Sequence, residues 1–322
     1  SIVTFFLVFC SLLFINVHAF DKQDLLNPSF SHAILFSWDG VQYDHLIELY
    51  NAGNLTNLKQ LVSETRLPIL RALITDHLTE TNNAYPSILS GVGQGEADGC
   101  PDNITIWENI ETLNNTWMTG AVVGKAKFTN IIFPYAHLDV DFWYAADTSA
   151  SQVTDQAVNF IHNYSQKNFF LFIHYREPDL AGHSYGENSL NYDNALIECD
   201  TELGRVLSTL EAEGIGDSTA IVVTTDHGFQ ENGYGHISPA WGADNGDPAL
   251  YTTWIACNIG TVDITNAVNN YWDQNDVAPT IYDLIGINDY SIRWPYIRGS
   301  ALWHRSFQTR DIAVTDIQLS SN

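Results

Sequence analysis

The sequence predicts an α/β fold with a largely parallel central sheet and helices on both of its faces. Short apolar runs without polar alternation, such as residues 33–38 (AILFSW) and 169–174 (FFLFIH), are typical of strands buried on both faces. Segments with helical periodicity separate these runs, as in β–α–β units. The length of 322 residues and the hydrophobic content of 45% suit one large domain.

The first half of the chain is expected to alternate strands with helices. Residues 33–38, 67–74 and 119–123 are apolar and are expected to be strands. Residues 43–62 have helical periodicity that Gly53 interrupts, because glycine disfavours a helix interior. A helix rich in small residues is expected to end at Ser90 and Gly91, and residues 106–113 are expected to form the next helix.

The second half continues the same alternation. Residues 153–164 are amphipathic and precede the strand at 169–174. Residues 190–213 carry apolar side chains at helical spacing and stop before Gly214, a common helix terminator. The strands at 220–223 and 250–259 follow. Residues 276–284 are expected to form a helix with Pro279 in its first turn.

Composition limits the class of partner. The formal net charge is −25 and the isoelectric point is about 4.4, which disfavours a nucleic acid duplex or an anionic membrane surface. A small anionic substrate would need a local source of positive charge, and divalent metal ions could supply it. The composition leaves the oligomeric state open.

The N-terminal residues indicate export. Residues 2–15 form an apolar run that is too short to span a bilayer comfortably, and Val17-His18-Ala19 matches the small-x-small cleavage pattern. We expect residues 1–19 to be a signal peptide truncated at its start, with an uncleaved membrane anchor as the lesser alternative. A single catalytic domain, residues 20–322, would remain, without a stable membrane span. We expect it to be secreted or periplasmic.

The segment TTDHGFQENGYGH, residues 224–236, combines potential metal ligands with a turn. Asp226 and His227 directly follow the expected strand at 220–223, and His236 lies nine residues after His227. Open α/β sheets place their sites at the carboxyl ends of strands, and carboxylate oxygen with imidazole nitrogen suits zinc. Taken alone, the segment is equally compatible with a surface turn.

Similar side chains follow other expected strands. Asp39 ends the first strand, and Asp179 and His183 follow the strand at 169–174. Thr81 precedes the small-residue helix. With Asp226, His227 and His236 these residues offer six ligands, three for each of two divalent ions. Two ions roughly 4 Å apart clamp an in-line phosphoryl displacement and lower the pKa of a bound hydroxyl.

These motifs resemble the alkaline phosphatase superfamily, in its type I phosphodiesterase/nucleotide pyrophosphatase and phosphonoacetate hydrolase branch. The resemblance covers residues 31–302 and includes the first-strand Asp-Gly, Thr81, the EPDLAGHSYG string, the DHG triplet and the later Gly-His. It implies an alkaline phosphatase-like fold and two Zn²⁺ ions, although other divalent ions would also fit. The implied ligands are Asp179, His183 and His236 for one ion and Asp39, Asp226 and His227 for the other, with Thr81 as nucleophile and additional ligand.

The resemblance also implies substrate-binding residues. Lys125 and Lys127, after the strand at 119–123, match a Lys-x-Lys that holds an anionic group in the phosphonoacetate hydrolase branch. Two solvated surface lysines are the alternative. Relatives place an asparagine three residues after the nucleophile, where this chain has Ala84, and Asn83 is the expected substitute. We expect His174 to have a core role, although it could face the site.

The expected function is hydrolysis of phosphate esters through a phospho-threonine intermediate. A phosphodiesterase or nucleotide pyrophosphatase is the leading expectation, and a phosphomonoesterase or a phosphonate hydrolase is the alternative. No Cys-x-Pro-x-Arg string is present, which disfavours a sulfatase with a formylglycine nucleophile. An exported protein that binds metals without catalysis is an alternative of a different class.

Overall fold

The computed structural model describes most of the chain between Phe30 and Leu302. The described stretches are residues 30–63, 69–74, 77–92, 105–113, 116–131, 140–237, 247–259, 272–293 and 297–302. The expected signal peptide, residues 1–19, lies outside the described residues. Within them, no helix combines the length and the apolar character that crossing a membrane requires.

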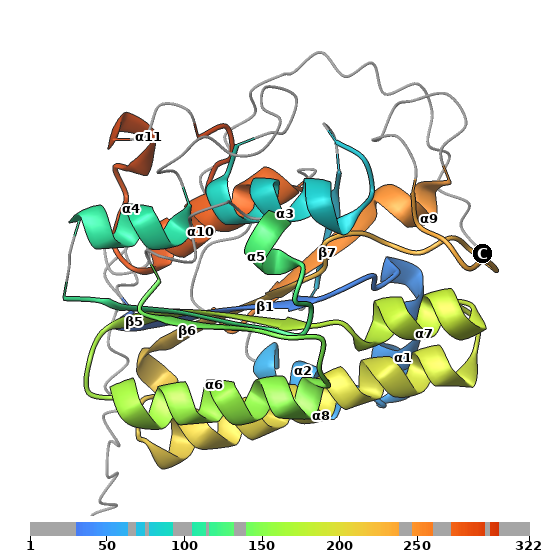
Figure 1. Cartoon of the computed structure of the whole chain (residues 1–322), viewed down its shortest axis with the longest axis horizontal. Helices are drawn as coiled ribbons and strands as arrows, with labels where there is room; N and C mark the ends of the chain where they lie inside the picture. Colours follow the sequence, from blue (N-terminus) through green and yellow to red (C-terminus); the bar gives the residue numbers. More distant parts are fainter. Residues whose placement is uncertain are drawn as a thin grey trace, which may run out of the picture.

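One eight-stranded sheet forms the centre of the molecule (Figure 1). The strand order is β4-β3-β5-β1-β6-β7-β2-β8. Every neighbouring pair is parallel except the two that β7 makes with β6 and β2, so the expectation of a largely parallel sheet is confirmed. The strands are β1 His32–Trp38, β2 Leu70–Leu73, β3 Met118–Val123, β4 Phe142–Ala145, β5 Phe169–Tyr175, β6 Thr219–Thr224, β7 Thr252–Cys257 and β8 Trp272–Asp273.

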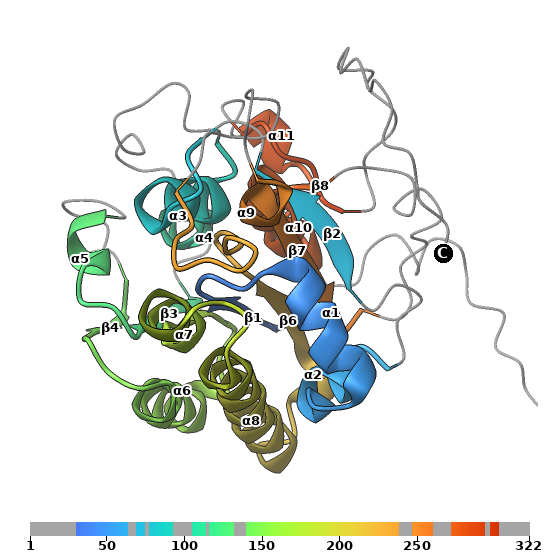
Figure 2. The same ribbon diagram turned by 90° about the vertical axis from the view of Figure 1, so that its right-hand side faces the viewer.

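Helices cover both faces of the sheet. Figures 1 and 2 place α3, α4 and α10 over one face, and α1, α2, α6 and α8 over the other. The helices are α1 Tyr43–Ala52, α2 Thr56–Leu61, α3 Thr81–Ser90, α4 Ile106–Leu113, α5 Phe128–Ile131, α6 Ala150–Tyr164, α7 Glu177–Tyr185, α8 Leu190–Ala212, α9 Pro248–Tyr251, α10 Val277–Leu284 and α11 Tyr290–Arg293.

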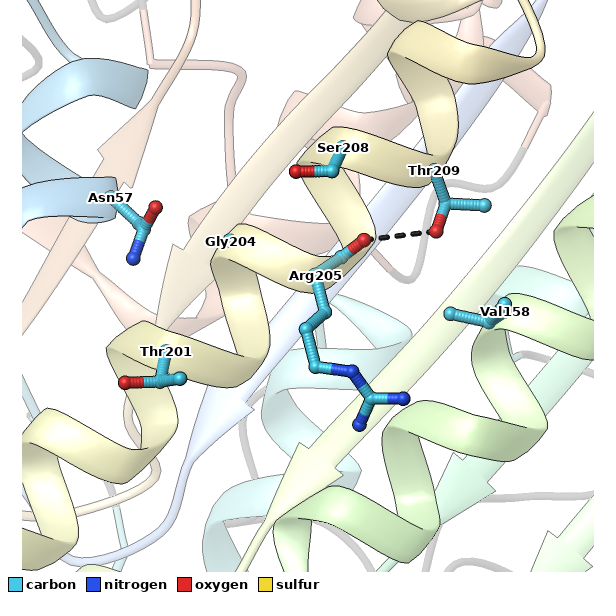
Figure 3. A pocket seen from close by; sticks show the side chains of 7 residues that line it. All are labelled: Asn57, Val158, Thr201, Gly204, Arg205, Ser208 and Thr209. Atoms are coloured by element: carbon cyan, nitrogen blue, oxygen red, sulfur yellow. Dashed lines mark hydrogen bonds between the residues drawn. The ribbon is translucent and has the colours of Figure 1, made fainter.

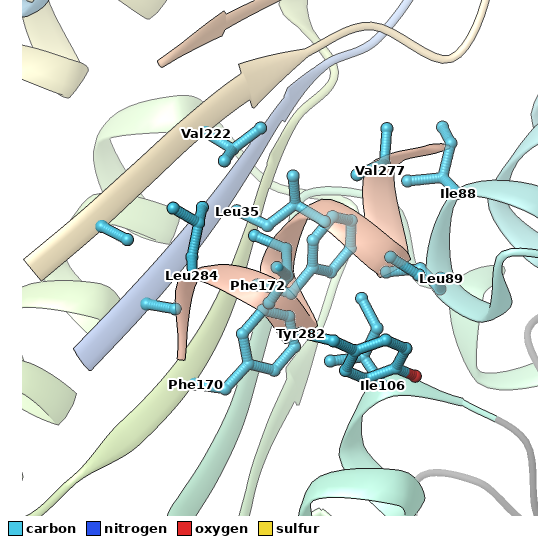
Figure 4. Close-up of a cluster of buried hydrophobic side chains, with 14 of the residues drawn as sticks. Leu35, Ile88, Leu89, Ile106, Phe170, Phe172, Val222, Val277, Tyr282 and Leu284 are labelled. Atoms are coloured by element: carbon cyan, nitrogen blue, oxygen red, sulfur yellow. The ribbon is translucent and has the colours of Figure 1, made fainter. Parts of the chain in front are cut away.

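Two hydrophobic cores result from the period-two alternation of the strands. On β1, Ala33 and Leu35 join the core under α3, α4 and α10, which Figure 4 shows. Ile34 and Phe36 point to the opposite core, under α1, α6 and α8. All four side chains are fully buried. Burial of one such large side chain stabilises the fold by about 1.5–3 kcal/mol, so both faces contribute.

The candidate site residues follow three adjacent strands. β1 lies between β5 and β6, with Trp38 in register with Tyr175 and Ser37 in register with Thr224. The carboxyl ends of these parallel strands therefore coincide at one edge of the sheet. Residues just beyond those ends converge there, which is the arrangement that the sequence predicted.

Three differences from the expected elements concern short segments. The strands β4 and β8 have only four and two residues, too few for a clear periodicity. The strand expected at 250–259 begins at Thr252, because Pro248 opens the helical turn α9 instead. The segment that carries Asp179 and His183 forms α7, so the two ligand candidates lie four residues apart on one helical face.

Candidate metal centre

Asp39 lies directly after β1 and is fully buried. The next residue, Gly40, adopts a positive φ of 72°, and a Cβ there would lie 3.0 Å from the Cβ of Asp179. Only glycine combines this backbone conformation with such a close approach at low cost. Gly40 therefore allows the loop after β1 to pass against α7, which brings the two aspartates together.

Asp226 and His227 lie in the turn after β6, and both are fully buried. One carboxylate oxygen of Asp226, Oδ1, accepts hydrogen bonds from the backbone N–H groups of Gly40 and His227, each at 3.0 Å. The side-chain amide of Gln274 donates to the carbonyl oxygens of Thr225 and Asp226. These contacts fix the turn and leave the second carboxylate oxygen, Oδ2, without a hydrogen-bond partner.

The three candidate histidines share one orientation. Each places its Nδ1 within hydrogen-bond distance of a backbone carbonyl, which can only accept, so Nδ1 carries the proton and Nε2 keeps a lone pair. Metal-binding histidines in proteins are usually held in this way. The pairs are His183 with Tyr234 O (2.9 Å), His227 with Gly228 O (2.9 Å) and His236 with Thr79 O (2.8 Å).

The ligand atoms form two groups whose members lie within 4.8 Å of one another. The outer group consists of Asp179, His183 and His236, and the inner group consists of Asp39, Asp179 and His227. The resemblance implied that Asp226 joins Asp39 and His227, whereas the inner group contains Asp179 in that place. Asp226 borders the inner group, because its Oδ2 lies 3.4 Å from Nε2 of His227.

The chemistry of these atoms fits divalent cations. Oδ1 of Asp179 lies 3.3 Å from Nε2 of His183 and 3.4 Å from Nε2 of His236. Two acceptors that face each other at such a distance require a proton or a cation between them. Buried acceptors without a protein hydrogen-bond partner are Asp39 Oδ1, Asp179 Oδ1, Asp226 Oδ2 and His227 Nε2. Leaving such groups unpaired costs about 1–3 kcal/mol each, and bound cations would remove that cost.

Lys125 lies between the carboxylates and is buried, so the alternative of a solvated surface lysine is wrong for this residue. Its Nζ lies 2.7 Å from Oδ2 of Asp39 and 2.7 Å from Oδ2 of Asp179. Burial by itself would lower the pKa of Lys125, but the two carboxylates outweigh that effect and raise the pKa above its usual value. Lys125 is therefore charged at every physiological pH.

The three aspartates differ in their acidity. Burial would raise the pKa of Asp39, yet Lys125 and His174 outweigh it and hold the pKa well below its usual value. The pKa of Asp179 falls to about 2, because His183 and Lys125 outweigh both burial and the neighbouring Asp39. Burial, reinforced by Asp39, raises the pKa of Asp226 to about 8. Without a cation, the cluster keeps a proton on Asp226.

The three candidate histidines also differ in their pKa. Burial lowers the pKa of His227, and burial with the adjacent His227 lowers the pKa of His236 to about 4. Both rings are therefore neutral at pH 7, the form that binds metals. Asp179 lies beside the exposed side chain of His183 and raises the pKa of that imidazole despite partial burial.

Thr81 begins α3 and is buried, with 3% of its surface exposed. Two contacts fix this end of the helix. Thr79 and His236 exchange hydrogen bonds, each side chain with the other residue's backbone carbonyl. One turn into α3, the hydroxyl of Tyr85 lies 2.8 Å from that of Ser37 on β1. The start of α3 is thus held between the outer group and the end of β1, and a helix N-terminus favours anions.

The other expected substrate-binding residues lie outside the carboxylate cluster. Asn83 is half-buried in the first turn of α3, and Lys127 is exposed. His174 has a larger role than the core position expected for it. It is fully buried, and its Nε2 lies 2.8 Å from Oδ2 of Asp39. Its register position beside Ser37 on β1 is the signal that connects it to the site.

A hollow of about 410 Å³ lies elsewhere, between α2, α6 and α8 (Figure 3). Arg205 lines it but forms ion pairs with Asp155 and Glu202 at 2.6 and 2.7 Å. None of the candidate ligands lines this hollow. It therefore contributes no side chain to either ligand group.

Comparisons with known proteins show which proteins this chain is similar to. The family model described as type I phosphodiesterase / nucleotide pyrophosphatase matches residues 104–261. A Xenopus laevis protein named bis(5'-adenosyl)-triphosphatase enpp4 is 23% identical over 226 residues, which cover 65% of this chain and 49% of that protein. A Candida glabrata protein named GPI ethanolamine phosphate transferase 1 is 29% identical over 215 residues, 59% of this chain and 21% of that protein. The chain thus spans about half or less of the length of these relatives.

Solved structures show the same fold. A Vibrio parahaemolyticus protein of the alkaline phosphatase superfamily superposes with a TM-score of 0.57 at 15% identity, covering 81% of this chain and 69% of that one. The chain therefore has an alkaline phosphatase-like fold. Over residues 104–261, just under half of its length, it is similar to the type I phosphodiesterase / nucleotide pyrophosphatase family.

Proposed function

We propose that the protein is an exported, metal-dependent hydrolase of phosphate esters that uses Thr81 as its nucleophile. The observation that carries the proposal is the set of buried acceptor atoms without hydrogen-bond partners at the carboxyl ends of β1 and β6 and on α7. A site with three imidazole nitrogens and three carboxylates favours zinc over magnesium or calcium, which prefer all-oxygen ligands.

The residues divide the work of binding. In our proposal His183, His236 and Asp179 hold one ion, and His227, Asp39 and Asp226 hold the other, with Asp179 close to both. When bound, two divalent ions neutralise phosphoryl oxygens and lower the pKa of hydroxyl groups beside them. The helix N-terminus at Thr81 adds favourable partial charge for the phosphoryl group.

The covalent steps are a double displacement. The Thr81 hydroxyl loses its proton, and its oxygen attacks phosphorus while the bond from phosphorus to the leaving oxygen breaks. The leaving alcohol or phosphate takes up a proton. Water then attacks the phospho-threonine, the bond from phosphorus to the Thr81 oxygen breaks, and Thr81 is restored with its proton. Because the pKa of His183 is raised and its ring must be neutral to bind a metal, we expect activity to rise toward alkaline pH.

A phosphodiester or a nucleotide pyrophosphate is the substrate class that we favour. The family match and the relative named bis(5'-adenosyl)-triphosphatase support this choice. A phosphomonoester or a phosphonate would use the same metals and nucleophile. A metal-binding protein without catalysis would retain the ions and lack turnover.

A paired assay separates these alternatives. The purified protein is loaded with zinc and tested on bis-p-nitrophenyl phosphate and on p-nitrophenyl phosphate, with metal content measured in the same samples. We expect faster turnover of the diester, complete loss with a chelator and recovery with zinc. Faster turnover of the monoester would indicate a phosphomonoesterase. No turnover of either ester by zinc-loaded protein, or of a nucleotide pyrophosphate, would refute the proposal.

A further inference from the structure

Lys125 follows a strand that is not adjacent to β1, yet its side chain contacts two carboxylates of the candidate site. It follows β3, and β5 separates β3 from β1 in the sheet. Its side chain nevertheless reaches across the end of β5 to Asp39, at 2.7 Å, and to Asp179 on α7, at 2.7 Å. Ordering and burying a long side chain has an entropic and a desolvation cost, which these two ion pairs offset.

In both carboxylates, Asp39 and Asp179, the two oxygens have different surroundings. In each, Oδ2 receives the Lys125 ammonium, and in Asp39 it also receives the imidazole N–H of His174 at 2.8 Å. In each, Oδ1 has no hydrogen-bond partner and faces a candidate histidine ligand. Oδ1 of Asp39 lies 3.7 Å from Nε2 of His227, and Oδ1 of Asp179 lies 3.3 Å from Nε2 of His183. One ammonium therefore sets the rotation of both carboxylates and directs one oxygen of each toward the candidate metal positions.

Charge supports the same conclusion. Three buried aspartates, Asp39, Asp179 and Asp226, lie close together and repel one another when ionised. Among the described residues, Lys125 is the lysine or arginine that forms ion pairs with this cluster. Lys127, two residues later, is exposed and remains available to contact an anion outside the cluster.

We infer that Lys125 is a built-in cation that ties Asp39 to Asp179 and positions both carboxylates, rather than a residue that contacts the substrate. This role rests on the proposed metal site but not on the identity of the substrate. The ammonium and the metal ions neutralise the same carboxylates. Loss of Lys125 should therefore weaken the metal-free protein more than the metal-loaded protein.

The test compares melting temperatures of Lys125→Met with those of Lys127→Met, the matched control on the same loop. Each variant is measured after chelation and after zinc loading. Removing one partner of a buried ion pair is strongly destabilising, so we expect the melting temperature of metal-free Lys125→Met to fall by about 5 °C or more. Zinc should restore most of this loss, and Lys127→Met should match the wild type in both states.

Zinc titration gives a second readout. By thermodynamic linkage, a variant weakened mainly in its metal-free state binds metal at least as tightly as the wild type.

If Lys125→Met fails to fold, Lys125→Arg and Lys125→Gln replace it in the test. Only arginine keeps the charge, so only Lys125→Arg should keep the metal-free melting temperature. An unchanged metal-free melting temperature with a raised KM would overturn the inference and indicate a substrate contact. These melting temperatures do not depend on any activity, so they remain decisive if the protein hydrolyses no phosphate ester.

Discussion

The outer and inner ligand groups share Asp179 but differ in exposure. In the inner group, Asp39 and His227 are fully buried beneath the turns after β1 and β6. In the outer group, the side chain of His183 is 45% exposed. The inner position is enclosed by residues at strand ends, and the outer position is completed by a helix and the loop that ends at His236. The candidate site thus combines one deep and one accessible position.

The difference follows from how each ligand is supported. Asp39 and Asp226 are held by backbone groups next to the sheet, where neighbouring strands fix the geometry. His183 lies on α7 and is oriented by the carbonyl of Tyr234, a residue of the loop after β6. Rigid support at the inner group and loop support at the outer group predict unequal responses to mutation.

The largest effect should come from Thr81→Ala. The variant lacks the hydroxyl that we propose forms the covalent bond, and neither group loses a histidine or carboxylate ligand. We expect turnover to fall by at least about 1000-fold, roughly 4 kcal/mol of transition-state stabilisation, with metal content unchanged. Steady-state kinetics and metal analysis on the same preparation measure both. Full activity in this variant would show that the nucleophile lies elsewhere.

The histidines of the two groups should differ in their effect on stability. In metal-free protein, His227→Ala leaves a cavity in a fully buried position, which should lower the free energy of unfolding by about 2–4 kcal/mol. His183→Ala removes a largely exposed ring and should cost about 1 kcal/mol or less. Denaturant unfolding of both variants measures the difference. Equal losses would contradict the contrast between a buried and an accessible group.

Asp226 should make metal-free stability depend on pH. Its pKa rises from about 4 in the unfolded chain to about 8 in the fold, so between these values the folded state binds more protons. Ionisation of Asp226 therefore removes stability as pH increases, by at most about 1.4 kcal/mol per pH unit. We expect stability between pH 6 and pH 8 to fall more steeply in the wild type than in Asp226→Asn. Identical slopes in chelator-treated samples would exclude this role for Asp226.

The smallest effect concerns metal release. Because the outer group reaches solvent through His183, a chromogenic chelator should remove zinc in two phases, with the outer ion first. His183→Ala should accelerate only the fast phase, by roughly tenfold. Release of both equivalents of zinc in a single phase would indicate that exposure to solvent does not distinguish the two positions.

The sequence predicted the sheet and the convergence of the ligands for a clear physical reason. Asp39 and Asp226 follow apolar strands, and parallel strands that lie side by side must end at the same edge. The expectation that Lys125 binds substrate rested on the resemblance. Its contacts with Asp39 and Asp179 could not be predicted, because the side chain crosses β5 and no local pattern encodes such a reach. The contact between His174 and Asp39 likewise depends on the register of β5 with β1. The pairing between strands determines the contacts of Lys125 and His174. The convergence of the ligand candidates follows instead from their positions after the strands along the chain.

Anomalous diffraction at the zinc edge from crystals of zinc-loaded protein tests the central claim most directly. Our account predicts two peaks, one within about 2.0–2.2 Å of the Nε2 atoms of His183 and His236, and one at the same distance from Nε2 of His227. Lys125 should remain on Oδ2 of Asp39 and Asp179. A single peak, or peaks away from these histidines, would contradict a two-metal site at the ends of β1 and β6.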